Sequence, residues 1–186
     1  MKGGYTVMLD VGANVEADAE QLVEFAIMGE AFARAVSDEP RPKVALLNVG
    51  AEDQKGHEEI RAAARLIRES GVDINFQGFV EGDDISKGTA DVVVTDGFTG
   101  NIALKTGEGT ARLVAQLLRE HLTGGPLAQL GALIAYPALR KLRTRMDPGT
   151  FNGALFLGLN GLVVKSHGSA NGRGYAAAIG VAEKLA

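Results

Sequence analysis

The chain has 186 residues, enough for one domain with a sizeable core, and 46% of them are hydrophobic, which excludes disorder on grounds of composition. Its net charge of −4 argues against non-specific nucleic-acid binding. With three histidines and no cysteine, the sequence offers no disulfide, no thiolate and no pattern of metal ligands, and we expect no cofactor. No apolar run approaches the roughly 20 residues of a transmembrane helix, and no signal peptide begins the sequence, so we expect a cytoplasmic protein.

Short β-branched runs alternate with amphipathic segments along the chain. The expected strands are 6–11, 43–48, 74–76, 91–95, 154–157 and 162–164. The expected helices are one capped by Asp18 and Gln21, then 56–70, about 100–122, and 170–186. This alternation predicts a layered α/β fold with a mainly parallel sheet, whose ligands bind in the loops after the strands.

The segment 126–145 has a helical period but is interrupted by Gly131 and Pro137. A basic cluster ends it, composed of Arg140, Lys141, Arg143 and Arg145. The cluster suits an acidic protein or anionic lipid head groups. A helical hairpin whose apolar stripe packs in a dimer interface, with its basic end solvated, explains the same pattern.

The loops that follow the first two expected strands contain residues suited to ligand binding, and the second is suited to an anion. They are Gly12 and Asn14 in the first loop, and Asn48, Gly50 and Lys55 in the second. Glycine allows close backbone approach, and a lysine at a helix start favours a phosphate. A tight turn and a solvated lysine remain equally good explanations of each loop taken alone.

The loop after the fourth expected strand is the richest in polar groups. Its candidates are Asp96, Thr99, Gly100, Asn101 and Lys105. Lys105 lies one helical turn beyond Asn101 on the same face, and Asp96 could hold either side chain in place. A purely structural helix cap would not need Gly100, Asn101 and Lys105 together, so a ligand site is favoured.

A further apolar strand ends in Lys165, Ser166 and His167. Adjacent side chains point apart in an extended chain, so Ser166 and His167 need not form a nucleophile–base pair. No aspartate lies nearby in the sequence to orient His167, and a Ser–His–Asp triad is therefore poorly supported.

Four runs of the sequence resemble the PlsX-type phosphate acyltransferase family. They are DVGANVEADAEQLVEFAIMGEAFA at 10–33, LLNVGAEDQKGHE at 46–58, FQGFVEGDDISKGTADVVVTDGFTGNIALK at 76–105 and GLNGLVVKSHGSAN at 158–171. They occur in the family's order and, with the intervening segments, cover nearly the whole chain. The DGFTGNI loop is also similar to one in phosphotransacetylases.

The resemblance implies a fold similar to that of isocitrate and isopropylmalate dehydrogenases. Residues 1–186 would be the C-terminal part of the phosphate acyltransferase domain, with its N-terminal part missing and a projecting helical segment near 115–147. The implied reaction transfers an acyl group from acyl-acyl carrier protein (acyl-ACP) to inorganic phosphate, in phospholipid synthesis. The implied enzyme is a cytoplasmic homodimer that contacts the membrane peripherally and passes acyl-phosphate to the membrane acyltransferase PlsY.

In that reaction a positioned phosphate is itself the nucleophile, so the protein supplies positioning and oxyanion stabilisation. The expected catalytic residues are Asp96, Asn101, Lys105 and His167. The expected substrate-binding residues are Gly12, Asn14, Asn48, Gly50, Lys55, Thr99, Gly100, Asn160, Lys165 and Ser166. The alternatives are an inactive module that binds ACP or a membrane, and phosphotransacetylase-like acyl transfer. A dehydrogenase lacks support because no GxGxxG motif follows a strand.

Overall fold

The computed structural model describes residues 5–146, 152–168 and 170–185, without the side chains of Arg143, Arg145 and Met146. Part of the predicted basic cluster, Arg143 and Arg145, therefore lies outside the described side chains. The chain divides into two compact units, Met1–Thr106 and Gly107–Ala186. Each unit is described by itself below.

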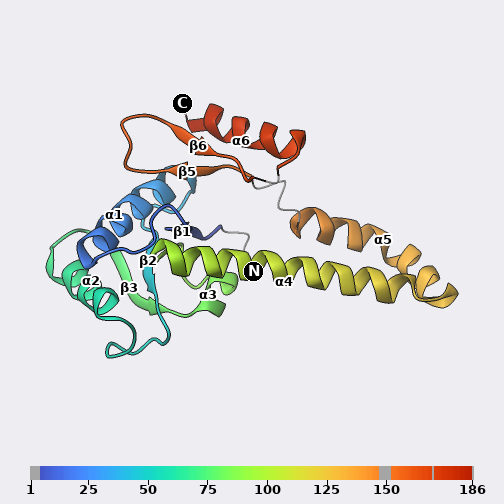
Figure 1. Ribbon diagram of the computed structural model, residues 1–186, viewed down its shortest axis with the longest axis horizontal. Helices are drawn as coiled ribbons and strands as arrows, with labels where there is room; N and C mark the ends of the chain where they lie inside the picture. The colour runs from blue at the N-terminus through green and yellow to red at the C-terminus, as the bar shows by residue number, and fades with distance from the viewer. Residues whose placement is uncertain (1–4, 147–151, 169, 186) are drawn as a thin grey trace. The chain divides into compact units, whose positions relative to one another are not determined.

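The first unit is built on a four-stranded sheet in the order β1-β4-β2-β3, and all its neighbouring strands are parallel. Figure 1 labels β1, β2 and β3 of this sheet together with α1 and α2. Its elements are β1 (Val7–Leu9), α1 (Ala19–Val36), β2 (Lys43–Leu47), α2 (Glu58–Glu69), β3 (Asn75–Val80), α3 (Gly82–Lys87) and β4 (Val92–Val94). This arrangement confirms the predicted α/β class and the parallel sheet. The predicted capping box is also present, because Asp18 accepts from the Gln21 backbone N–H and Gln21 accepts from that of Asp18.

Apolar side chains on both faces of the sheet form the core of this unit. Alternate residues of a strand point to opposite faces, so β2 and β4 contribute to two clusters. One contains Val44, Leu46, Val92 and Val94 with Leu22 and Ala26 of α1 and Ala63, Ala64 and Ile67 of α2. The other contains Ala45, Leu47, Val80, Ala90 and Val93. A sheet buried on both faces explains the unbroken valine run of β4.

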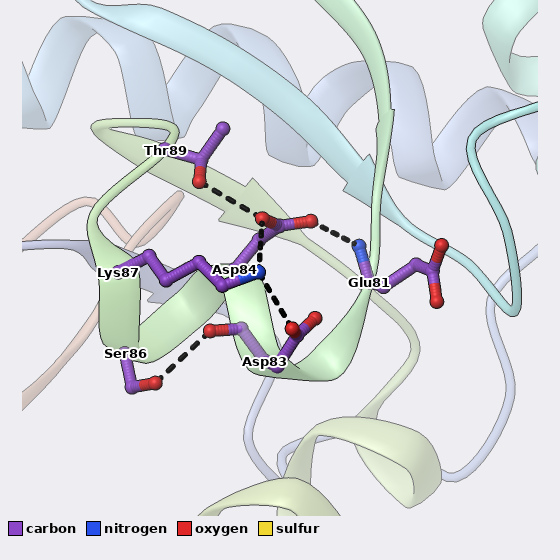
Figure 2. Close-up of polar contacts among 6 residues, drawn as sticks. All are labelled: Glu81, Asp83, Asp84, Ser86, Lys87 and Thr89. Carbon is purple, nitrogen blue, oxygen red and sulfur yellow. Dashed lines mark hydrogen bonds and ion pairs between the residues drawn. The ribbon is translucent and has the colours of Figure 1, made fainter.

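The short helix α3 was not predicted, because it has almost no apolar periodicity. Its start is fixed by polar contacts: the Glu81 backbone N–H donates to the Asp84 carboxylate at 3.0 Å, and the Thr89 hydroxyl donates to the same carboxylate at 2.9 Å (Figure 2). Gly88 ends it in the left-handed conformation, at φ 68°. Ile85 is the apolar contribution of α3 to the core. Local capping, which hydrophobic patterns do not report, therefore specifies α3.

The helix α4 (Gly97–Thr123) begins in the first unit and continues into the second. The second unit also contains α5 (Pro126–Met146), β5 (Ala154–Phe156), β6 (Val163–Lys165) and α6 (Gly172–Leu185). β5 and β6 pair as an antiparallel hairpin, in a sheet of their own. The predicted interruption of α5 is wrong: the helix runs through Gly131 and Pro137, because an internal proline removes one helix hydrogen bond without forbidding the next turn. None of the described helices combines the length and the apolar character that a membrane-spanning segment needs.

Candidate functional site

Three of the predicted loops begin at the same edge of the parallel sheet. The register pairs Val94 of β4 with both Leu9 of β1 and Leu46 of β2. The residues that follow these partners, including Asp10 and Asn48, therefore leave the sheet at its carboxyl edge. This is where ligands of open α/β sheets bind.

The loop after β1 packs directly against the first turn of α4. A Cβ atom added at Gly97 would lie 1.8 Å from the Asn14 carbonyl oxygen, and one added at Gly100 would lie 1.8 Å from the Asp10 carbonyl oxygen. Gly12, at φ +111°, faces the Asn101 side chain: a Cβ atom added at Gly12 would lie 3.4 Å from Asn101 Cβ. Two expected binding residues of this loop, Gly12 and Asn14, are thereby brought beside the start of α4.

Asp10, which sequence reasoning did not single out, organises this loop. Its Oδ1 accepts from the backbone N–H groups of Gly12 (2.9 Å) and Ala13 (2.7 Å). Its Oδ2 accepts from the backbone N–H and the side-chain amide of Asn14, both at 2.8 Å. Burial raises the pKa of Asp10, but the hydrogen bonds from Ala13, Asn14 and Gly12 together hold it below its ordinary value. The loop amides are thus bonded to a carboxylate of the same chain.

Asp96 caps α4. Its carboxylate accepts from the Thr99 backbone N–H at 2.8 Å and from the Thr99 hydroxyl at 2.7 Å. This cap accounts for an aspartate at position 96 and a threonine at position 99. Asn101 and Lys105, further along the helix, are exposed polar residues that the cap does not involve. Thr95, directly before Asp96, is almost fully buried, and its hydroxyl has no hydrogen-bond partner in the described part of the chain.

The loop after β2 is closed by the buried side chain of Asn48. Its amide donates to the Lys55 carbonyl at 3.0 Å, and its oxygen accepts from the Val49 N–H at 2.9 Å. Gly56, at φ +88°, passes so close that an added Cβ would lie 2.0 Å from the Asn48 oxygen. Lys55 is exposed and forms an ion pair with Glu52 at 3.0 Å. The ion pair lowers the pKa of Glu52, chiefly through the hydrogen bond from Lys55.

The remaining expected residues, Asn160, Lys165, Ser166 and His167, belong to the second unit. Ser166 and His167 follow β6, and the exposed Asn160 lies in the turn before it. Asn152, a residue that sequence reasoning missed, holds the segment after β6. Its amide donates to the Ser166 hydroxyl and to the Gly174 carbonyl, and its oxygen accepts from the His167 N–H, all at 2.8 Å.

A carboxylate from a distant part of the sequence lies beside His167. Glu108 Oε1 of α4 is 3.7 Å from His167 Nε2, and Arg112 of the same helix is 3.7 Å from the other Glu108 oxygen. Glu108 lies 59 residues before His167 in the sequence, so the residues next to His167 gave no sign of this partner. The Ser166 hydroxyl instead contacts Asn152. Within the described residues, no group of three His, Asp or Glu side chains could hold a metal ion.

Comparison with known proteins assigns the chain to a family. The profile of a family described as fatty acid synthesis protein matches residues 1–186. The chain is 63% identical to a phosphate acyltransferase of Caulobacter vibrioides over 183 residues, covering 98% of the chain and 51% of that protein. It is 60% identical to one of Maricaulis maris, covering 98% and 52%, and 58% identical to one of Parvibaculum lavamentivorans, covering 98% and 51%. The chain spans about half the length of these relatives, and it belongs to the fatty acid synthesis protein family.

Proposed function

We propose that the protein containing this chain is a phosphate acyltransferase that forms acyl-phosphate from acyl-ACP and inorganic phosphate, in phospholipid synthesis. The observation that carries the proposal is the family match over residues 1–186, together with the phosphate acyltransferase names of relatives at 58–63% identity. The polar loops at the carboxyl edge of a parallel sheet support it, because that edge is the usual ligand site of such sheets.

The proposal includes an assembly and a location. The whole protein would share the fold of isocitrate and isopropylmalate dehydrogenases, form a homodimer in the cytoplasm, contact the membrane peripherally and supply PlsY. Long apolar side chains exposed on α4 and α5 suit such contacts; they include Leu117, Leu127, Leu133, Ile134 and Tyr136. They would be covered by a second subunit or by lipid.

In the proposed reaction, a phosphate oxygen attacks the thioester carbonyl carbon. The new C–O bond forms, the C–S bond breaks, and the carrier sulfur leaves as a thiolate that takes up a proton. Phosphate is already a nucleophile when it is held in place, so binding and orientation are the main demands. Asn101 and Lys105 would hold phosphate at the start of α4, with Asn14 beside them. The helix dipole at this end favours the anion.

The residues of the hairpin would serve the leaving group. His167 would donate the proton to the thiolate, a general-acid contribution typically worth about 10²–10⁴-fold in rate. Glu108 Oε1 lies 3.7 Å from His167 Nε2, where it would help to orient the imidazole ring. Lys165 and Ser166, next to His167 in the sequence, would contact the substrate.

The decisive assay is acyl-phosphate formation by this chain from acyl-ACP and phosphate, with the Caulobacter vibrioides relative as positive control. Formation of acyl-phosphate supports the proposal. Binding of ACP without turnover would favour an interaction module. Turnover of acyl-coenzyme A in preference to acyl-ACP would favour phosphotransacetylase-like transfer.

Lys105→Ala and Asn101→Ala should each raise the KM for phosphate about tenfold or more, because each removes a group placed to bind the anion, and a charge-assisted hydrogen bond is worth at least one decade of affinity. Matched controls are Lys43→Ala and Asn75→Ala, at the opposite, amino edge of the sheet. Steady-state kinetics at varied phosphate would measure the change. An unchanged phosphate dependence in both test variants, with the fold intact by circular dichroism, would refute these roles.

A further inference from the structure

The carboxylate of Asp10 forms its hydrogen bonds with the loop that follows it. It accepts four hydrogen bonds, two on each oxygen, from Gly12, Ala13 and Asn14. The residue is 9% exposed, so few of its contacts are available to solvent. A buried carboxylate with this many donors stays ionised and rigid, because removing any donor leaves charge without compensation.

The loop that Asp10 fixes has no free space against α4. Gly97 and Gly100 let the helix approach the carbonyl oxygens of Asn14 and Asp10 more closely than any side chain would permit. The Phe98 N–H also donates to the Val15 carbonyl, at 3.2 Å. A shift of the loop would therefore have to move the first turn of α4 as well.

This loop contains Asn14, and its Gly12 lies against Asn101 of the helix. Asn14 is exposed at the end of the Asp10-bonded segment, and its amide is oriented by Asp10 Oδ2 at 2.8 Å. Gly12 lies against the Asn101 side chain, so the path of the loop also limits where Asn101 can turn. The position of both asparagine side chains thus depends on one carboxylate.

We infer that Asp10 is a positioning residue, which fixes the Gly12–Asn14 segment against α4 and thereby sets the placement of Asn14 and Asn101 for phosphate. The inference rests on the proposed function, because that function supplies the phosphate that these two amides would bind. Asp10 itself does not touch substrate in this scheme, since both of its oxygens face its own loop.

An asparagine of the same size cannot replace Asp10. If its NH₂ group takes the place of Oδ2, it faces the two donors of Asn14. If the amide flips, the NH₂ group faces the N–H groups of Gly12 and Ala13. Either orientation sets a donor against two donors, so two hydrogen bonds are lost. Asp10→Asn therefore tests the charge and acceptor pattern without changing the volume.

The first measurement is structural and uses the 186-residue chain. We expect Asp10→Asn to speed amide hydrogen exchange by about tenfold or more at the N–H groups that lose their acceptor, which are either those of Gly12 and Ala13 or that of Asn14. Asp18→Asn is the matched control, because asparagine caps a helix as well as aspartate does. Unchanged exchange in Asp10→Asn would overturn the inference, whatever reaction the protein performs.

The second measurement is kinetic. The phosphate KM of Asp10→Asn should rise about tenfold or more while the acyl-ACP KM stays within about twofold, since the loss concerns one anion site. The KM for phosphate of the double variant Asp10→Asn/Asn14→Ala should not exceed that of the more impaired single variant, because both substitutions remove the same oriented amide.

A merely structural role predicts a different result: less folded protein, a lower melting temperature and an unchanged phosphate KM, with the two substitutions additive. That result would overturn the positioning role. If the wild-type protein forms no acyl-phosphate at all, the proposed function fails, and the exchange comparison still decides whether Asp10 fixes the loop.

Discussion

Asn48 in the first unit and Asn152 in the second are both buried asparagines that close a polar loop, but they do so in different surroundings. Asn48 bonds to Val49 and Lys55, within its own loop, beside strands whose side chains are almost fully buried. Asn152 connects three segments of the chain, through Ser166, His167 and Gly174. In the described part of the second unit, Ala178 is the only buried hydrophobic residue.

The difference shows two ways of fixing a loop. In the first unit an apolar core sets the strands, and the polar contacts only shape the loops that leave them. Among the described residues of the second unit little apolar area is buried, and a buried amide with three hydrogen-bond partners therefore contributes more to holding the segments in place. Apolar burial is worth roughly 25 cal/mol per Å², so its scarcity makes each hydrogen bond of the hairpin count for more.

The largest effect is expected where the first unit leaves no space. Gly100→Ala should destabilise the protein by about 3 kcal/mol, because its Cβ would meet the Asp10 carbonyl oxygen and the backbone cannot rotate away. Gly107→Ala, in the same helix with nothing within 4 Å, should stabilise by up to about 1 kcal/mol. Urea unfolding monitored by circular dichroism measures both. Equal effects of the two substitutions would show that the loop contact does not constrain α4.

A smaller difference should separate the two buried asparagines. Asn152→Ala should cost about 2 kcal/mol and Asn48→Ala about 1 kcal/mol, because the partners of Asn48 lie in an exposed loop that water can reach, whereas the Gly174 carbonyl is part of a buried contact. Thermal melting of both variants, with NMR signals assigned to each unit, provides the comparison. A larger loss in Asn48→Ala would reverse our account of the second unit.

The smallest effect on stability is expected on the exposed surface of α5. Arg140→Gln with Lys141→Gln should change the free energy of unfolding by less than about 0.5 kcal/mol. It should weaken binding to vesicles containing anionic lipid about thirtyfold at low salt, since each of the two basic residues contributes about 1 kcal/mol near such a surface. Arg34→Gln with Lys43→Gln removes the same charge from the first unit as control. Equal loss of vesicle binding in both pairs would assign the effect to net charge alone.

The sequence predicted most of the first unit because its signals are local. The valine run of β4 and the Asp18–Gln21 capping box each act through neighbours in the chain, and both were found where expected. The strands after residue 150 were also located, but their antiparallel pairing apart from the parallel sheet was not foreseen. Pairing depends on contacts between segments, which a hydrophobic pattern does not contain.

The candidate site was predicted less completely, for a related reason. Glycines and exposed polar residues such as Gly12, Asn14 and Asn101 stand out in a sequence, and the structure places Gly12 against Asn101 and the loop of Gly12 and Asn14 against the first turn of α4. Asp10 and Asn152 do not stand out, since a single polar residue beside a strand usually has no special role. Their importance comes from the number of partners each reaches, and for Asn152 these are 14 to 22 residues away.

Because Asp10 accepts four hydrogen bonds as a carboxylate, the order of its loop depends on the protonation state of Asp10 and therefore on pH. Because the folded-state pKa of Asp10 lies below its ordinary value of 3.8, its stabilising effect is fully present above that pH and is lost only as the pH falls through the lower folded value. Protonation would turn one acceptor oxygen into a donor facing N–H groups. The order of the Gly12–Asn14 segment is therefore insensitive to pH across the neutral range, and only strong acid would release it.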